Sequence, residues 1–198
     1  MVRIMGTPKL STSIKKYNSI MEDFSDPKSK VTNDDFKKKF NGYYRMGRMA
    51  KKGNDYMNKF FIILEKYRSN TDDKNKAPIT FENVLRELWN ETGVFTPSFA
   101  SKLVATINPD MPIWDTFVKR HCHVSHPAMD DDVNIRIAAA KKGYEKIYNT
   151  LRLDSENLLK EFNKMCKNDK DINQQEIDKI SEMKRIDFVI WLNRQRIK

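Results

Sequence analysis

Lys102 and Asp115 are the two residues of this chain whose types and spacing best suit chemistry. A lysine becomes a nucleophile when partial burial lowers its pKa, and a carboxylate offsets positive charge that develops in a reaction. Asp115 follows Lys102 by 13 positions, and apolar residues surround both in the chain. The sequence therefore predicts an amine and a carboxylate that flank one site beside a hydrophobic wall.

Two short helices joined by a tight turn are expected to position this pair. Thr96 is a good N-cap and the proline after it suits a first helical position, which predicts a helix over residues 97–107. Apolar residues every four positions give this helix a buried face, with Lys102 at its edge. Asn108-Pro109 stops the helix, and Asp115 is expected to open the next one.

The segment that starts at Asp115, D-T-F-V-K-R, resembles the D-T-H-V-x-R motif of the helix-hairpin-helix DNA glycosylases, the endonuclease III superfamily. The residues that match the motif are Asp115, Thr116, Val118 and Arg120, while Phe117 replaces its histidine. In that family the aspartate stabilises the sugar cation as the base leaves. A lysine on the second helix of the hairpin, when present, is the nucleophile. The resemblance therefore implies the first role for Asp115 and the second for Lys102.

The hairpin of this chain departs from the family pattern. The family reads L-P-G-x-G-x-[KS], whereas residues 94–99 contain no glycine. The lysine–aspartate spacing is shorter than usual by roughly five residues, more than one helical turn, and Trp114 is an extra residue before Asp115. Glycines let the backbone approach a phosphate closely. We expect the hydroxyls of Thr96 and Ser98, with the N–H groups of that helix start, to replace part of this contact.

The fold class is predicted to be all-α, with about ten helices. Apolar residues recur at helical spacing along the chain, and no five-residue window alternates like a strand. The 198 residues suit a single domain over 1–198, with a polar stretch near residues 68–79 as a lobe boundary. The resemblance implies two helical lobes around a cleft.

The composition favours an anionic partner. The formal net charge is +10 and the sequence pI is about 9.5, which fits nucleic acid, although a lysine-rich solubilising surface would give the same charge. Two cysteines cannot hold the four-thiolate iron–sulfur cluster of some glycosylases, and no cofactor is expected. We expect a cytoplasmic monomer that binds DNA and no membrane, because the chain has no apolar run that would span one.

A helix predicted from Phe36 to about Met49 is dense in cations, with aromatic residues among them. The residues expected to contact DNA are Lys37, Lys38, Lys39, Arg45 and Arg48 here, and Lys119 and Arg120 beside the motif. Tyr43 and Tyr44 lie among the first group, and cations interleaved with aromatic rings suit a nucleic-acid backbone with a stacked base. The alternative is a solvated helix face with both tyrosines in the core.

Four aromatic residues near the motif are predicted to form walls of a base pocket, although each also suits the core: Trp89, Phe95, Phe99 and Trp114. A group of histidines with one cysteine follows the motif: His121, Cys122, His123 and His126. No second ligand pair follows at zinc spacing, so we interpret this group as a polar helix exit and expect no metal site. The acids of Asp130–Asp132 suit the positive end of the long helix after them.

The leading hypothesis from the sequence is a DNA glycosylase of base excision repair that flips and excises a damaged or modified base. The base must leave the stack because the duplex shields its glycosidic bond. Attack by Lys102 would also give a Schiff base and lyase activity at the abasic site. The simpler alternatives are that Asp115 only caps a helix and that Lys102 is a surface cation. The chain would then be a non-catalytic nucleic-acid-binding module, or a protein-interaction domain whose charge is incidental.

Overall fold

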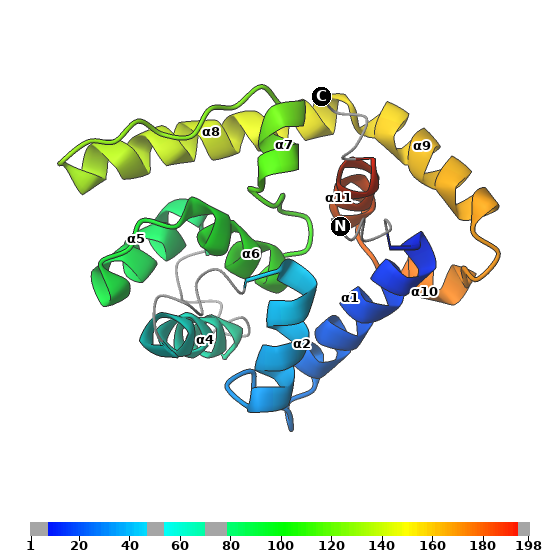
Figure 1. Ribbon diagram of the computed structural model, residues 1–198, viewed down its shortest axis with the longest axis horizontal. Coiled ribbons are helices and arrows are strands. Elements are labelled where there is room, and N and C mark those ends of the chain that lie inside the picture. Colours follow the sequence, from blue (N-terminus) through cyan, green and yellow to red (C-terminus); the bar gives the residue numbers. More distant parts are fainter. Residues whose placement is uncertain (1–7, 47–53, 70–78, 194–198) are drawn as a thin grey trace, which may run out of the picture.

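The computed structural model describes residues 8–46, 54–69 and 79–193. Within these ranges the chain is all-helical, with ten α-helices and no strand, which confirms the predicted fold class (Figure 1). The helices are α1 (Leu10–Ser25), α2 (Asp34–Tyr44), α4 (Asn54–Arg68), α5 (Phe81–Thr92), α6 (Pro97–Ile107), α7 (Thr116–His121), α8 (Val133–Leu153), α9 (Ser155–Asn168), α10 (Gln174–Asp178) and α11 (Glu182–Leu192). None of the described helices is long and apolar enough to cross a membrane.

The helices are arranged around α6, α7 and α11, which lie toward the middle of the molecule (Figure 1). The long helix α8 runs along one side and packs on α5, which also contacts α4 and α6. α11 contacts α7, α9 and α1, so it connects the motif helix with the first and the ninth labelled helices. Buried apolar side chains from α1 through α11 form one continuous core. Most of the predicted lobe boundary near residues 68–79 lies outside the described residues.

Local capping signals set several helix boundaries where the sequence predicts them. The Thr80 hydroxyl accepts a hydrogen bond of 3.2 Å from the backbone N–H of Asn83 at the start of α5. Gly93 ends α5 in the left-handed conformation with φ of 65°, which glycine adopts without strain. Helix α2 is shorter than predicted. It ends at Tyr44, because Arg45 is itself left-handed with φ of 52°.

The segment 108–115, which joins α6 to α7, contacts α5 and α8 on one side and the start of α11 on the other. The Trp114 indole is 1% exposed and stacks on Phe81, with ring centroids 6.0 Å apart. A Cβ atom on Gly143 of α8 would lie 2.7 Å from this indole, so only glycine permits the close approach. The hydroxyl of Ser181, at the start of α11, donates a 2.6 Å hydrogen bond to the carbonyl of Pro109.

Helix α1 is held by the C-terminal part of the described chain rather than by α2 alone. Its flanking Lys9 pairs with Asp171 at 2.8 Å, and its Glu22 pairs with Lys179 at 2.8 Å. The side-chain amide of Asn18, on its buried face, donates to the carbonyl of Glu176 at 2.9 Å. Residues more than 150 positions apart in sequence are therefore joined at several points.

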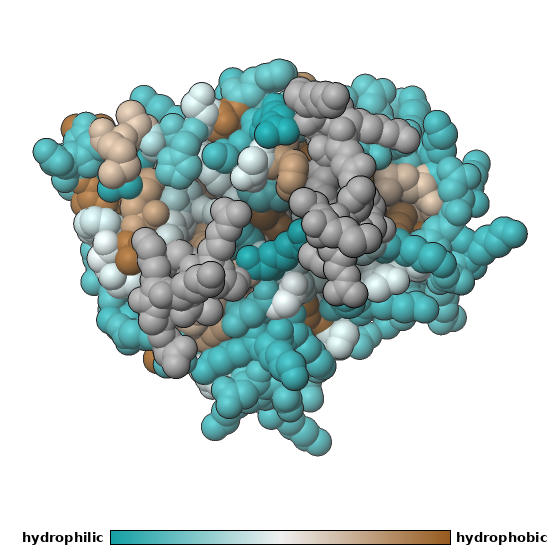
Figure 2. All heavy atoms as spheres, in the orientation of Figure 1, coloured by the Kyte–Doolittle hydropathy of each residue, from teal (hydrophilic) through white to brown (hydrophobic). Residues whose placement is uncertain are grey.

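Polar side chains cover most of the face of the molecule seen in Figure 2. Apolar groups gather at one end, over α5 and the beginning of α8. Two of the exposed apolar residues of the described chain lie just before and inside the first turn of α8, Met129 at 84% and Ile135 at 55% exposure. The face seen in Figure 2 is thus mainly hydrophilic, in keeping with the 32% of charged residues in the chain.

Candidate functional site: a buried cluster of charges between α6, α7 and α11

Lys102 is a buried lysine, only 7% exposed, and not the surface cation of the simpler alternative. Its side chain folds back along α6. Nζ donates hydrogen bonds to Oγ of Ser98 at 2.7 Å and to the carbonyl of Ser98 at 3.1 Å, and it lies 5.3 Å from the ring centroid of Phe99. Burial disfavours the charged ammonium and lowers the pKa of Lys102 to about 8. A minor fraction of the Lys102 side chain is therefore in the neutral, nucleophilic form near neutral pH.

Asp115 is the N-cap of α7, as the sequence predicts. Its Oδ1 accepts hydrogen bonds from the backbone N–H groups of Phe117 and Val118, both at 2.8 Å. Burial, followed by the nearby charge of Asp187, raises the pKa of Asp115 above its usual value. The two backbone N–H groups and the charge of Lys102 act in the opposite direction.

The structure brings Lys102 and Asp115 to one site. Each charge shifts the pKa of the other toward its ionised form, although the two side chains form no ion pair within 4.0 Å. Ser101, the neighbour of Lys102, accepts a 2.8 Å hydrogen bond on Oγ from the backbone N–H of Trp114, the neighbour of Asp115. This bond fixes the start of α7 against α6, so the two candidates lie near enough to influence each other despite the shortened spacing.

Helix α11 adds a second pair of charges that sequence reasoning did not identify, Lys184 and Asp187. Nζ of Lys184 lies 2.6 Å from Oδ2 of Asp187, and the side chains are 5% and 14% exposed. The available signal was the spacing, because Lys184 falls four residues after buried Ile180 and four before buried Phe188. A lysine at that position of an apolar stripe has to be buried with the stripe.

Aromatic rings from three helices surround the ammonium of Lys184. The distances from Nζ to the ring centroids are 4.8 Å for Tyr17, 5.0 Å for Phe188, 5.1 Å for Tyr43 and 5.6 Å for Tyr44. Such geometry is favourable for a cation over the negative faces of the rings. Tyr43 and Tyr44 therefore pack inward on the core, which agrees with the simpler alternative for them and leaves neither as an exposed stacking platform.

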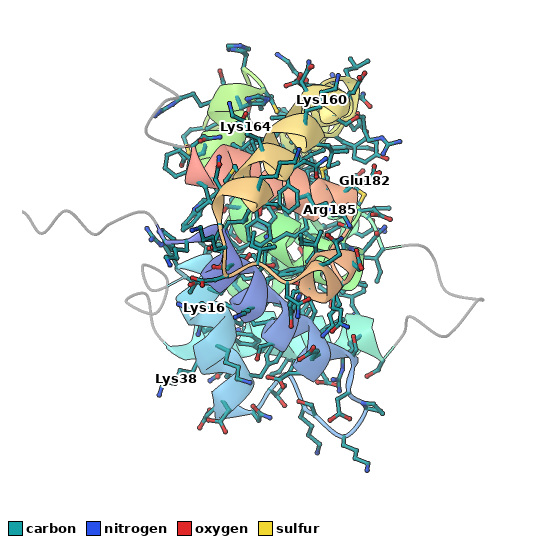
Figure 3. The ribbon with its side chains drawn as sticks, turned by 90° about the vertical axis from the view of Figure 1, so that its right-hand side faces the viewer. Lys16, Lys38, Lys160, Lys164, Glu182 and Arg185 are labelled. Atoms are coloured by element: carbon teal, nitrogen blue, oxygen red, sulfur yellow. The ribbon has the colours of Figure 1, made fainter. Side chains whose placement is uncertain are left out.

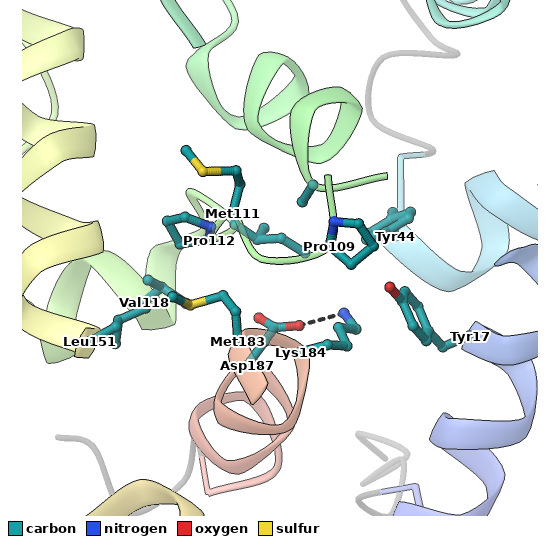
Figure 4. Close-up of a pocket in the computed structure, with 12 residues that line it drawn as sticks. Tyr17, Tyr44, Pro109, Met111, Pro112, Val118, Leu151, Met183, Lys184 and Asp187 are labelled. Atoms are coloured by element: carbon teal, nitrogen blue, oxygen red, sulfur yellow. Dashed lines mark hydrogen bonds and ion pairs between the residues drawn. The ribbon is translucent and has the colours of Figure 1, made fainter. Parts of the chain in front are cut away.

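A small cavity lies between segment 108–115 and α11 (Figure 4). Lys184, Asp187, Tyr17 and Tyr44 form its polar lining, and Val118 of α7 is among its apolar lining residues. Its volume is about 10 Å³. That is room for about one water molecule and far less than a nucleobase needs.

The four predicted walls of a base pocket do not line this cavity. Trp114 is enclosed in the core, and Phe99 packs edge-on against Tyr56 with centroids 5.5 Å apart. Phe95 lies under the guanidinium of Arg136 at 4.1 Å, and Trp89 is half-buried on α5. These aromatic residues serve the packing around the hairpin in this conformation.

The hydroxyls predicted to meet a phosphate have partners inside the protein. Oγ1 of Thr96 and the hydroxyl of Tyr56 share a 2.7 Å hydrogen bond, and Thr96 makes no side-chain hydrogen bond that caps α6. Oγ of Ser98 accepts from Lys102. The hairpin hydroxyls thus tie α6 to α4 and to the buried lysine.

The predicted DNA-contacting cations differ in their surroundings. Lys39 pairs with Asp23 at 2.6 Å and Lys37 donates to Asn58 at 3.2 Å, whereas Lys38 is exposed. Arg45 stacks on Trp191 at 5.1 Å and Lys119 lies over Trp114 at 6.0 Å. Arg120 is exposed on α7, and Arg48 lies outside the described residues. Further cations lie on the side of the molecule shown in Figure 3, among them Lys16, Lys160, Lys164 and Arg185.

Within the described residues, no group of three His, Cys, Asp or Glu side chains could hold a metal ion. In the cluster after the motif, His121 lies 3.3 Å from Asp154. Cys122 is buried, and neither cysteine of the chain is in a disulfide.

Comparison with protein-family models, with curated proteins and with solved structures finds no match to this chain.

Proposed function

We propose that the protein is a DNA glycosylase that excises a damaged or modified base, with Asp115 and Lys102 at its active site. The observation that carries the proposal is the buried Lys102, whose pKa of about 8 leaves it partly neutral, at one site with the Asp115 carboxylate. Buried ionisable groups with displaced pKa values cluster at functional sites. The net charge of +10 supports an anionic substrate.

In the proposed reaction the glycosidic C–N bond breaks, and the base departs with the bonding electron pair. The Asp115 carboxylate offsets the positive charge that develops on the sugar. The neutral amine of Lys102 then attacks the anomeric carbon, forms a C–N bond and loses a proton. The bond between the anomeric carbon and the ring oxygen then breaks as the nitrogen lone pair forms the imine, and the ring oxygen takes up a proton. Loss of a proton from the neighbouring carbon expels the 3′ phosphate, which cleaves the strand at the abasic site.

Base entry requires more room than the cavity of about 10 Å³ beside α7 offers. The proposal therefore requires that the site widens beside Asp115 when DNA binds, while α11 stays docked on segment 108–115 through the hydrogen bond from Ser181 to Pro109.

Replacing Asp115 with asparagine tests the carboxylate. Asparagine keeps the size and much of the capping ability but removes the charge, so base release should fall about 10²–10³-fold while DNA binding persists. The measurement is base release from oligonucleotides that carry assorted lesions and modified bases. A matched control is Asp132→Asn at the N-cap of α8, which should leave base release unchanged. Equal activity of the Asp115 variant and the wild-type protein would refute the catalytic role.

Borohydride trapping tests the amine. If Lys102 attacks the sugar, reduction during turnover should link the protein covalently to DNA, and Lys102→Ala should abolish this adduct. We expect the loss of base release to be larger in Asp115→Asn than in Lys102→Ala, because water can replace an amine nucleophile. An adduct that persists in Lys102→Ala would assign the nucleophile to another residue.

A second candidate function is a nucleic-acid-binding module without catalysis. The observation that favours it is that Oδ1 of Asp115 accepts two backbone N–H groups, a complete structural role for an N-cap. Absence of base release from every lesion, with DNA binding that weakens as salt rises, would support this module over the enzyme.

A further inference from the structure

The ion pair of α11 is poorly explained as a stabilising contact. Lys184 and Asp187 are almost fully buried, and taking two charges out of water costs about as much as their attraction returns. Apolar residues of similar volume often serve such a position equally well or better. Stability therefore does not explain the two charges, and the charged groups beside them suggest another role.

The protein holds this pair rigidly in place. Four aromatic rings surround the ammonium, and the hydrogen bond from Ser181 to Pro109 docks the start of α11 on the segment that leads to Asp115. Burial alone would lower the pKa of Lys184, but the charge of Asp187 and the nearby tyrosine side chains raise it well above the usual value. Lys184 thus remains charged and fixes the orientation of the Asp187 carboxylate (Figure 4).

The Lys184–Asp187 pair lines the same cavity as Ala105 of α6, three residues after Lys102, and Val118 of α7, three residues after Asp115, so the Asp187 carboxylate lies near both candidate catalytic residues. Its negative charge raises the pKa of Lys102 and that of Asp115, whereas the charge of Lys184 lowers the pKa of Lys102. The charged groups that influence Lys102 are thus Asp115 at the start of α7 and both members of the α11 pair. Two cations and two carboxylates from three helices form one buried cluster, with the Ser98 hydroxyl as an uncharged partner.

We propose that the Lys184–Asp187 pair is a positioning pair for Lys102 and Asp115, which sets the charge that each of them carries when a sugar reaches the site. The proposal rests on the proposed function, because the charge of Lys102 matters only if its amine reacts. An amine buried without a nearby carboxylate loses its proton more readily but is also a weaker nucleophile. A general base or nucleophile works best with a pKa near the operating pH. Asp115 and, to a smaller extent, Asp187 oppose the effect of burial on the pKa of Lys102, and Asp187 thereby helps to hold it in that range.

The titration of Lys102 provides a test that does not depend on base release. Lysine labelled with ¹³C at Cε reports the protonation of each amine by NMR, and the signal of Lys102 is assigned by its loss in Lys102→Met. In Asp187→Asn the midpoint of this signal should fall by about one pH unit, the lower end of the effect of a nearby opposite charge. A midpoint equal to that of the wild-type protein would overturn the proposal.

A second variant and a control variant complete this test. Asp187→Asn leaves Lys184 buried without its partner, so if it does not fold, the double variant Lys184→Gln with Asp187→Asn decides instead. Its Lys102 midpoint should fall by less, because the removal of Lys184 partly offsets the loss of Asp187. The control is Glu156→Gln with Lys160→Gln, an exposed pair with the same 2.6 Å separation, which should leave the midpoint unchanged.

Base release distinguishes failure of this inference from failure of the proposed function. If the wild-type protein releases a base, the rise of the rate with pH should move to lower pH in Asp187→Asn, and Asp187→Glu should restore the wild-type profile. A displaced NMR midpoint without base release from any substrate would retain the positioning pair and reject the glycosylase. Base release with a pH profile that Asp187→Asn leaves in place would retain the glycosylase and reject the positioning pair.

Discussion

The segment 108–115 between α6 and α7 has two sides with opposite physical character. On one side the Trp114 indole is enclosed by Phe81 and by the bare backbone of Gly143. On the other side the next residue, Asp115, lies within the electrostatic influence of Lys102 and Asp187. One peptide bond thus separates an apolar anchor from a buried ionic cluster.

The two sides contribute to the free energy of folding with opposite sign. Burying the indole stabilises the fold, because a large apolar surface leaves water. Burying Lys102 and Asp115 displaces the pKa of each toward its neutral form, which means that the fold disfavours their charges. A segment selected only for stability would not place Asp115 beside other buried charges. The difference between the two sides therefore supports a functional role for the ionic cluster.

The largest effect is expected from removing the apolar anchor. Trp114→Ala should lower the free energy of unfolding by about 3–5 kcal/mol, since it deletes a fully buried aromatic side chain and leaves a cavity. Chemical denaturation measures this loss. Trp89→Ala on α5, where the indole is half-buried, is the control and should cost less. Similar losses in the two variants would contradict the special role of Trp114 as an anchor.

Lys102→Met should raise the free energy of unfolding, whereas Trp114→Ala lowers it. The pKa of Lys102 is about 8 in the fold and 10.5 when unperturbed, so the unfolded chain holds its proton more tightly. The variant should therefore be more stable than the wild-type protein at pH 7, by up to about 3 kcal/mol. This advantage should shrink between pH 8 and 10.5, where the unfolded wild-type chain alone stays protonated and the stability of the wild-type protein rises.

Denaturation curves at several pH values check this prediction. Lys160→Met is the control, because its side chain is 69% exposed and its replacement should change stability little at any pH. A clear destabilisation of Lys102→Met at pH 7 would show that the buried amine contributes to the fold instead of opposing it.

The smallest effect is expected at Gly143, the residue of α8 that packs against the Trp114 indole. In Gly143→Ala the new methyl group would lie 2.7 Å from the Trp114 indole, so the ring or α8 must shift, and we expect a loss of about 1–3 kcal/mol. Gly42→Ala in α2 is the control. It meets nothing within 4 Å and should be neutral or stabilising, because alanine favours a helix. Thermal unfolding that ranks the two variants in the reverse order would contradict the close contact.

Features that depend on neighbouring residues could be predicted from the sequence. Thr80, Gly93 and Asp115 each cap a helix through their own side chain or backbone conformation, so local pattern was sufficient. The all-helical fold also follows from apolar residues at helical spacing. Helix α2 was predicted to be too long because nothing in its sequence shows that Arg45 adopts a left-handed conformation.

Features that depend on distant segments could not be predicted. Lys102 occupies the edge of an apolar face, and its burial depends on the packing of other helices around α6. The partners of Asp115 in the cluster include Asp187, which is 72 positions later in the chain. Trp114 suited both a pocket wall and the core. Its contact with Gly143 of α8 cannot be read from the residues around it, so the sequence could not decide between the two.

The ties between α1 and the segment around α10 have a consequence for synthesis on the ribosome. The apolar face of α1, which includes Ile14 and Tyr17, packs in part against α10 and α11, and its ion pairs reach Asp171 and Lys179. At about 5–20 residues per second, the ribosome needs on the order of 10–30 s to make the chain between these elements. During that interval α1 has been made together with α2, but without its partners α10 and α11. Final closure of the fold, and with it the docking of α11 beside Asp115, therefore has to follow the synthesis of almost the whole chain.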